Sequence, residues 1–404
     1  MNIENNRSFD VTESLVAKGK SPLPMAIGPA NSSFLDICRG AAASIVLLGH
    51  AQDIFHIGPG FRVPGVLGVS IFFLLSGFLI AISIFNHLMK DNPQLSVFLS
   101  DRVARIATPF LPVLCLVAAI NWLLDPGNWG QFGVNRGAYA FIGNALLLND
   151  YPVLQGLSNK WNITSYYVRS YNTAEPFWTI PIEFWIYVGV GVFAFVILGR
   201  EKIRLGFGLA ALLIATPVIV WNSFAGGGKC LTLIWFVGAG FGGLWICLRR
   251  QLGRKLWPVG IVLLFYGLAS LTGKVLKAPF DPLEVQTAIL MASILFGVAF
   301  LLEGLEDRKA LRQFGVILSS YSYSLYLVHN TVLVLAFEYS PRPDSTAYLV
   351  AIFSAHIVAV IIYLLFERHY RRVSMTIRPL LAMLCSPQNT ASTGNVSMQA
   401  SNKA

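Results

Sequence analysis

The sequence FLDICRGAAASIVLLGH, residues 34–50, is apolar enough to enter a membrane and yet carries Arg39 and His50. Eleven residues at about 100° each bring the two side chains to within about 20° of one another around a helix, about 16 Å apart along its axis. Ionisable groups at membrane depth are costly and usually mark a pathway or a reaction site. The sequence therefore predicts a membrane helix with a cation near one surface and an imidazole deeper on the same face.

The rest of the chain has the composition of a membrane protein, since 55% of its 404 residues are hydrophobic and only 12% are charged. Further apolar runs of spanning length lie at about 65–85, 103–124, 177–198, 205–222, 229–248, 257–273, 285–303, 315–337 and 346–366. With the first segment they predict an all-α fold, a polytopic transmembrane helical bundle of about ten spans.

One apolar run, at about 138–148, is too short to cross a membrane, and the charge pattern puts both its flanks outside. It is predicted to form a re-entrant or interfacial helix. A polar, aromatic loop follows at about 150–176. Its length suits a lid or an acceptor-binding surface, and equally a passive external loop with interfacial aromatic residues.

Clusters of Lys and Arg occur between alternate spans, which predicts that both termini are cytoplasmic. Most of these cations are expected to fix topology and to touch no substrate. The net charge of +10 therefore requires no nucleic acid partner. The predicted cytoplasmic clusters are Lys90, Arg102 and Arg105; Arg200, Lys202 and Arg204; Arg249, Arg250, Arg254 and Lys255; Arg308, Lys309 and Arg312; Arg368, Arg371, Arg372 and Arg378.

The two ends of the chain are polar and are predicted to be disordered cytoplasmic tails, residues 1–33 and 374–404, around a transmembrane domain of residues 34–373. No phosphate-binding loop, dinucleotide fingerprint or metal-ligand cluster is present in the sequence, so no metal site is expected. The five cysteines have spacings that suit neither a disulfide framework nor a zinc site.

Three ionisable residues are predicted to lie at one depth in the membrane. Counting 1.5 Å per residue from the start of each span places His50, His329 and Glu183 in a single layer. Two imidazoles and a carboxylate in one layer could handle protons. The alternative is that each is a buried polar residue that holds helices together through a neighbour.

A second candidate site lies nearer the predicted inner surface. Arg102 and Arg105 are three residues apart, on one helix face, and Arg39 lies only about 7 Å inside the same surface. Paired arginines bind lipid headgroups or fix topology by default. Together with Arg39, the pair favours an inward-facing site for a phosphate-bearing molecule.

Six motifs along residues 34 to 373 together resemble the membrane acyltransferase-3 family, in the family's order. They are LDICRG followed by His50, GVSIFFLLSGFLI at Gly68–Ile80, Arg102 with Arg105, FWTIPIEFWIY at Phe177–Tyr187, SYSLYLVH at Ser322–His329, and FERHYRR at Phe366–Arg372. The family often has a proline after the glutamate of the last motif, where this chain has Arg368. That departure concerns how a helix ends and leaves the chemistry untouched.

The resemblance implies an enzyme that transfers acetyl or other short acyl groups from cytoplasmic acyl-coenzyme A to sugars of surface or exported molecules. It implies His50 as general base, Arg39 as a residue that binds the donor or orients the acyl carbonyl, and Glu183 as an assisting residue. Arg102 and Arg105 would hold the coenzyme A phosphates. Whether an acyl-histidine forms is left open.

The prediction is therefore an O-acyltransferase of a bacterial inner membrane that uses acyl-CoA, in the first instance acetyl-CoA, as donor. Its expected partners are a glycan or glycolipid acceptor, such as lipopolysaccharide or exopolysaccharide, and membrane lipids, without nucleic acid. The acceptor, the acyl chain length and the oligomeric state stay open. A proton-coupled transporter or flippase is the alternative, in which the same buried groups would relay protons.

Overall fold

A computed structural model of the protein describes residues 25–57, 62–124, 135–161, 167–224, 230–277 and 279–386. Within these ranges every regular element is helical. The helices are α2 (Pro29–Phe55), α3 (Arg62–Leu88), α4 (Leu95–Leu124), α5 (Gly137–Ala145), α6 (Pro152–Trp161), η3 (Glu175–Trp178), α7 (Thr179–Phe193), η4 (Ala194–Leu198), α8 (Leu205–Phe224), α9 (Leu231–Leu252), α10 (Trp257–Val275), α11 (Val285–Leu302), α12 (Lys309–Ser320), α13 (Ser322–Tyr339), α14 (Ser345–Leu365), η5 (Glu367–His369) and α15 (Tyr370–Cys385).

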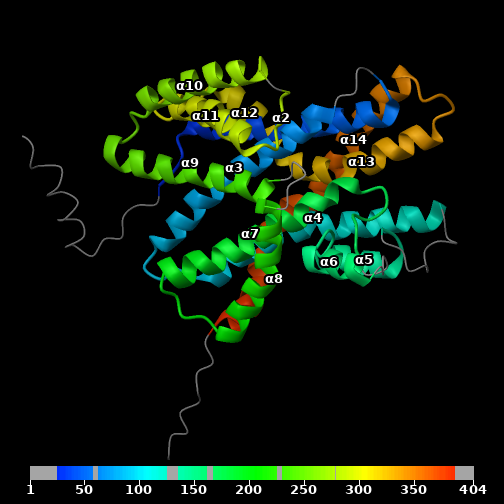
Figure 1. Cartoon of the computed structure of the whole chain (residues 1–404), viewed down its shortest axis with the longest axis horizontal. Helices are drawn as coiled ribbons and strands as arrows, with labels where there is room; N and C mark the ends of the chain where they lie inside the picture. Colours follow the sequence, from blue (N-terminus) through cyan, green and yellow to red (C-terminus); the bar gives the residue numbers. More distant parts are fainter. Residues whose placement is uncertain are drawn as a thin grey trace, which may run out of the picture.

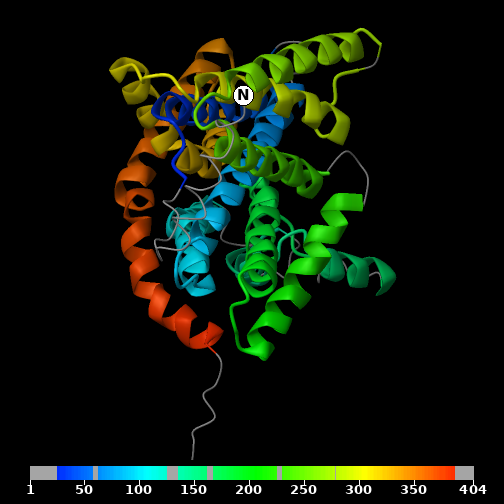
Figure 2. The ribbon, with the colours of Figure 1, turned by 90° about the vertical axis from the view of Figure 1, so that its left-hand side faces the viewer.

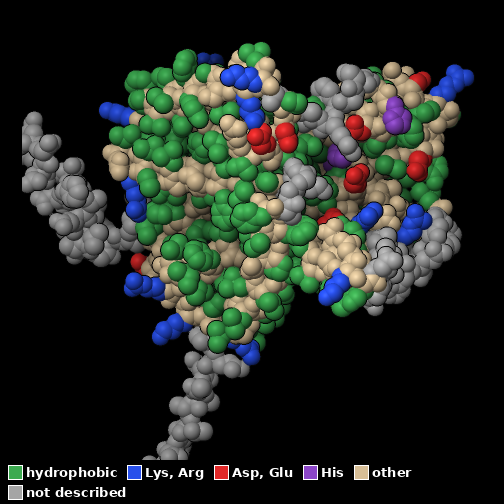
Figure 3. All heavy atoms as spheres, in the orientation of Figure 1, with side chains coloured by type: hydrophobic (Ala, Val, Ile, Leu, Met, Phe, Trp, Pro, Cys, Tyr) green, Lys and Arg blue, Asp and Glu red, His purple; other side chains and the backbone are tan. Residues whose placement is uncertain are grey.

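The prediction of an all-helical, polytopic membrane bundle is confirmed. Nine helical segments of the described chain are long and apolar enough to cross a bilayer. Hydrophobic side chains cover much of the face drawn in Figure 3, as expected of a surface that meets lipid. The protein is therefore an integral membrane protein.

α3 lies at the centre of the upper half of the bundle, between α2 and α9 (Figure 1). Small residues allow the close approach of α3 to α9. A Cβ atom on Gly77 would lie 2.0 Å from the carbonyl oxygen of Trp235, and one on Gly238 would lie 2.1 Å from that of Leu74. Close backbone contact of this kind is how membrane helices associate without a hydrophobic driving force between them.

Gly238→Ala is therefore expected to destabilise the protein by about 1–3 kcal/mol, because the new methyl group meets backbone that cannot rotate away. Gly240→Ala is the matched control on the same helix, since a Cβ there meets nothing within 4 Å. Thermal aggregation of the two variants in detergent measures the difference. Equal midpoints for both variants would show that the α3–α9 contact tolerates separation.

The single span predicted at 315–337 is wrong, because two helices occupy this region. α12 ends at Ser320 and α13 begins at Ser322, with Tyr321 between them in a non-helical conformation. The buried carboxylate of Glu367 causes the break by accepting hydrogen bonds from the amide (3.0 Å) and hydroxyl (2.6 Å) of Ser324 in the first turn of α13. α13 is 18 residues long and carries His329 and Asn330, and it is not among the nine apolar segments.

Helical structure extends past both predicted limits of the transmembrane domain. α2 begins at Pro29, where the amide of Gly28 donates to the buried carboxylate of Glu303. α15 runs to Cys385 and packs along α4, with the hydroxyl of Ser374 donating to Asp101 at 2.5 Å. Figure 2 shows α15 descending along one side of the molecule. The remainder of the two predicted tails, 1–24 and 387–404, lies outside the described residues.

α5 is the short helix expected at 138–148, and its position relative to the membrane stays a prediction. The loop predicted at 150–176 contains a helix, α6, as well as extended chain. Pro152 starts α6, since proline fits the first helical position, where no amide partner is needed. α6 lies against α8, and the hydroxyl of Tyr151 donates to the carbonyl of Ile214 at 3.0 Å.

Candidate functional site

Three arginines predicted from the sequence line one cavity of about 670 Å³, here named the arginine pocket. Arg39 comes from the first half of α2, and Arg102 and Arg105 come from the first half of α4. Glu183 of α7 completes the charged lining. The structure thus brings together side chains separated by more than 60 positions in sequence, and three cations face one carboxylate.

The two arginines of α4 are held in different ways. Arg105 Nη2 forms an ion pair with Glu367 Oε1 at 3.3 Å, and its guanidinium lies 5.1 Å from the ring centre of Tyr370. Arg102 Nη2 donates to Ser83 Oγ at 3.2 Å. Both contacts fix the guanidinium groups at the wall of the pocket, so less conformational entropy is lost when an anion binds.

Glu367 has a function that sequence reasoning missed. It is fully buried, and it contacts both Arg105 and the first turn of α13 through Ser324. A glutamate at the end of a long apolar run was the available signal, since a buried carboxylate needs a partner. The carboxylate links the arginine pocket to the helix that carries His329.

Glu183 lies in the arginine pocket and away from the histidines. Its carboxylate accepts a short hydrogen bond from the hydroxyl of Tyr187, which also bonds to Ser76 Oγ at 2.7 Å. Ser76 in turn accepts from Trp235 Nε1 at 3.1 Å. Within the described residues, Glu183 is not part of the cavity that contains His50. The single layer expected for Glu183 and the two histidines is therefore divided between two cavities.

The histidine cavity, of about 1240 Å³, is lined by His50 of α2 together with residues of α3, η3 and α13. The ring centres of His50 and His329 are 5.2 Å apart, so the structure brings together two imidazoles that the sequence placed at one depth. His329 is fully buried, and its Nδ1 lies 3.1 Å from the carbonyl of Leu325. Because a carbonyl only accepts, Nδ1 carries the proton and Nε2 is left with a lone pair.

Two exposed carboxylates, Asp53 and Glu175, line the same cavity. Sequence reasoning missed both. The spacing of His50 and Asp53, three residues apart on one helix face, could have identified the first. Figure 3 shows acidic and histidine side chains gathered in the upper right part of one face. The cavity thus combines an imidazole with two carboxylates.

A third cavity adjoins the other two and is here named the passage. It shares Glu183, Phe72 and Tyr323 with the arginine pocket, and it shares Val69 and Tyr326 with the histidine cavity. Its lining is largely apolar and aromatic. A series of three adjoining cavities therefore runs through the bundle from the arginines to the histidines.

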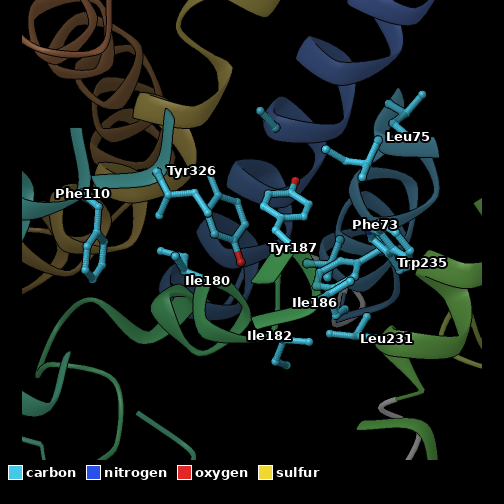
Figure 4. Packing of buried hydrophobic residues seen from close by; sticks show 14 of the residues in the cluster. Phe73, Leu75, Phe110, Ile180, Ile182, Ile186, Tyr187, Leu231, Trp235 and Tyr326 are labelled. Atoms are coloured by element: carbon cyan, nitrogen blue, oxygen red, sulfur yellow. The ribbon is translucent and has the colours of Figure 1, made fainter. Parts of the chain in front are cut away.

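Tyr326 stands where the passage meets the histidine cavity. Its hydroxyl lies 2.6 Å from Thr179 Oγ1 and 2.9 Å from the carbonyl of Pro176, and its ring centre is 5.8 Å from that of His329. Figure 4 shows Tyr326 and Tyr187 in the middle of the packed layer, between Phe110 on one side and Trp235 on the other. These contacts hold the ring of Tyr326 in place between the passage and the histidine cavity.

This arrangement suits a long molecule with an anionic head. Three arginines can hold phosphate oxygens by charge-assisted hydrogen bonds, while an apolar arm extends through the passage. The imidazole of His50 would then meet the far end of that arm. Among the described residues, no group of three or more His, Cys, Asp or Glu side chains is placed to hold a metal ion.

Residues 32–364 match the family model Acyl_transf_3, described as an acyltransferase domain. The match contains Arg39, His50, Arg102, Arg105, Glu183 and His329. No curated protein and no solved structure matched the chain.

Proposed function

The chain belongs to the acyltransferase-3 family of membrane enzymes, and from this premise we propose that it transfers an acyl group from acyl-coenzyme A to a hydroxyl group of a glycan. The proposal takes acetyl as the acyl group, and a surface or exported glycan such as lipopolysaccharide or exopolysaccharide as the acceptor. It also locates the protein in a bacterial inner membrane, with both termini in the cytoplasm. The observation that carries it is the series of adjoining cavities between three arginines and a histidine pair.

The donor would bind with its phosphates in the arginine pocket. Coenzyme A carries phosphates at one end and a thioester at the end of a long, thin arm, which matches a charged pocket followed by an apolar passage. Arg102 and Arg105 would hold phosphate oxygens. Arg39 lies about 16 Å from His50 along the same helix, so we assign it to the donor head and not to the acyl carbonyl.

The side of the membrane from which the donor enters is inferred from the predicted topology. Lys and Arg collect in cytoplasmic loops. The arginine pocket lies in the first halves of α2 and α4. The start of α4 lies beside the cluster at 200–204, since the amide of Leu95 donates to Glu201, and the start of α2 lies beside the cluster at 249–255, since Gly28 and Arg249 both contact Glu303. The arginine pocket would therefore open to the cytoplasm, where acyl-coenzyme A is made, and the histidine cavity to the opposite side.

His50 would act as general base at the far end of the donor. The acceptor hydroxyl oxygen attacks the thioester carbonyl carbon while its proton passes to His50, and the carbon–sulfur bond breaks. The leaving thiolate then takes that proton, which restores His50 and releases coenzyme A. Asp53 and Glu175 would stabilise the transient imidazolium, and His329 would position the His50 ring.

Binding of coenzyme A tests the donor site. Free coenzyme A at 100 times its dissociation constant should stabilise the purified protein by about 2.7 kcal/mol, seen as a higher aggregation temperature. Arg102→Gln and Arg105→Gln should each weaken binding by about 10- to 100-fold, because each removes charge-assisted hydrogen bonds. Arg312→Gln, at an exposed position on α12, is the control and should bind as wild type does.

The proposal fails if coenzyme A leaves the aggregation temperature of the wild type unchanged. It also fails if the three arginine variants respond alike, because the pocket would then contribute nothing to donor binding. Hydrolysis or transfer of acetyl-coenzyme A in proteoliposomes gives an independent readout of the same donor.

A further inference from the structure

A fourth cavity, of about 770 Å³, lies between α6, α7 and α8, beside the histidine cavity. We name it the tryptophan cavity. Trp178 lines both cavities, so they share a wall. The polar and aromatic residues that line it besides Trp178 are Asn149, Asp150, Gln155, Tyr167, Trp221 and Asn222. The donor and the reacting imidazole, as proposed above, use none of these six.

Asn149 gives this cavity a buried polar group that lacks a partner. The side chain is 2% exposed, and its Nδ2 donates to the carbonyl of Phe177 at 3.0 Å. Its Oδ1 has no hydrogen-bond partner within the described part of the chain. A buried oxygen without a donor costs free energy, so this oxygen is suited to accept from a hydroxyl group that enters the cavity.

Tyr167 and Asp150 form a second polar contact in the wall, through a hydrogen bond from the phenol to the carboxylate. Burial, together with the Asp150 carboxylate, raises the pKa of Tyr167, so the phenol keeps its proton at neutral pH. Tyr167 therefore remains a hydrogen-bond donor to Asp150. This fixes both side chains before any ligand arrives.

The charge of the lining decides which class of ligand fits. It contains the carboxylate of Asp150, and no Lys or Arg among the described residues that line it. The lining itself therefore offers no cation to a phosphate, and Arg169, whose guanidinium lies 5.5 Å from the ring centre of Tyr167, is not part of it. A neutral molecule with many hydroxyl groups would find amide and carboxylate partners, and its apolar face could stack on the indole of Trp221 or Trp178.

From these observations we propose that the tryptophan cavity binds one sugar unit of the acceptor, next to the unit that receives the acyl group. The inference rests on the proposed function and adds the position of the acceptor chain. A glycan that enters from the α6–α8 side would pass Trp178 and bring the next sugar hydroxyl to His50. Asn149 Oδ1 would accept a sugar hydroxyl, and Trp221 would stack against the ring.

The test uses methyl glycosides as probes: the methyl α-glycosides of glucose, galactose, mannose and rhamnose, with saturation-transfer NMR as readout. The protein is held in nanodiscs, because alkyl-glycoside detergents carry sugars themselves. Trp221→Ala is expected to weaken the binding of at least one glycoside roughly tenfold, since the stacking surface is lost. Trp122→Ala is the matched control, because both tryptophans are 50% exposed and Trp122 lines none of the cavities described above.

A second variant, Asn149→Leu, removes the unpartnered oxygen, and it should weaken the same glycoside if the protein still folds. Coenzyme A protection is measured on every variant and should be unchanged. Equal glycoside signals from Trp221→Ala and Trp122→Ala, strong or absent, would overturn the sugar site. Loss of coenzyme A protection in the wild type would instead overturn the proposed function, so the two failures are distinguishable.

Discussion

His50→Ala is expected to lower the rate of acyl transfer by about 10²- to 10⁴-fold, the contribution typical of a general base. A hydroxyl group is a poor nucleophile until its proton is removed, and in the histidine cavity the side chain placed to remove it is the imidazole of His50. Coenzyme A binding should be unaffected, because the arginine pocket lies on the other side of the passage. Release of coenzyme A in proteoliposomes with a glycan acceptor measures the rate.

His356→Ala is the matched control for this experiment. His356 belongs to α14, where its Nδ1 lies 3.3 Å from the hydroxyl of Tyr321, and it lines none of the cavities described above. The control should retain the wild-type rate. A folded His50→Ala protein that transfers at the wild-type rate would exclude His50 as the base.

Glu367→Ala is expected to lower the free energy of unfolding by about 3–5 kcal/mol, the cost of removing one partner from a buried ion pair. The carboxylate is fully buried, and it holds both Arg105 and the first turn of α13. Without it, Arg105 loses its ion-pair partner, and the amide of Ser324 loses its acceptor. Thermal aggregation in detergent, with and without coenzyme A, measures both the loss of stability and the loss of donor binding.

Two further variants separate the roles of Glu367. Glu367→Gln keeps an acceptor for Ser324 but removes the charge, so it should lose less stability than the alanine variant while still weakening coenzyme A binding. Glu338→Ala, at an exposed position of α13, should change neither quantity. If Glu367→Ala aggregates at the wild-type temperature, the link between α13 and Arg105 is not structural.

Several features of the site could be predicted because they depend on one helix at a time. Arg39 and His50 share a face of α2 since eleven residues complete just over three turns. The same reasoning placed Arg102 and Arg105 together on α4. Depth counting also put His50 and His329 at one level, and the structure has their rings 5.2 Å apart.

Depth alone could not say which helices are neighbours. Glu183 lies near the predicted level of the histidines, yet its partner is Tyr187, and it lines the arginine pocket. The helix break at Tyr321 could not be predicted from the sequence either, because residues 315–337 form one apolar run. Its cause is Glu367, which lies 43 positions after Ser324 in the chain.

The sequence by itself determined that this chain is a helical membrane protein, the approximate position of most of its apolar helices, and which ionisable side chains share a helix face. These properties are local, since they follow from apolar length and a period of 3.6 residues. Only the tertiary structure decided which cavities adjoin, which residues contact Glu183 and Glu367, and that Tyr326 lies between the passage and the histidine cavity. Lipid is as apolar as the helices themselves, so neighbours are selected by close contacts such as those of Gly77 and Gly238, and such contacts join distant parts of the chain.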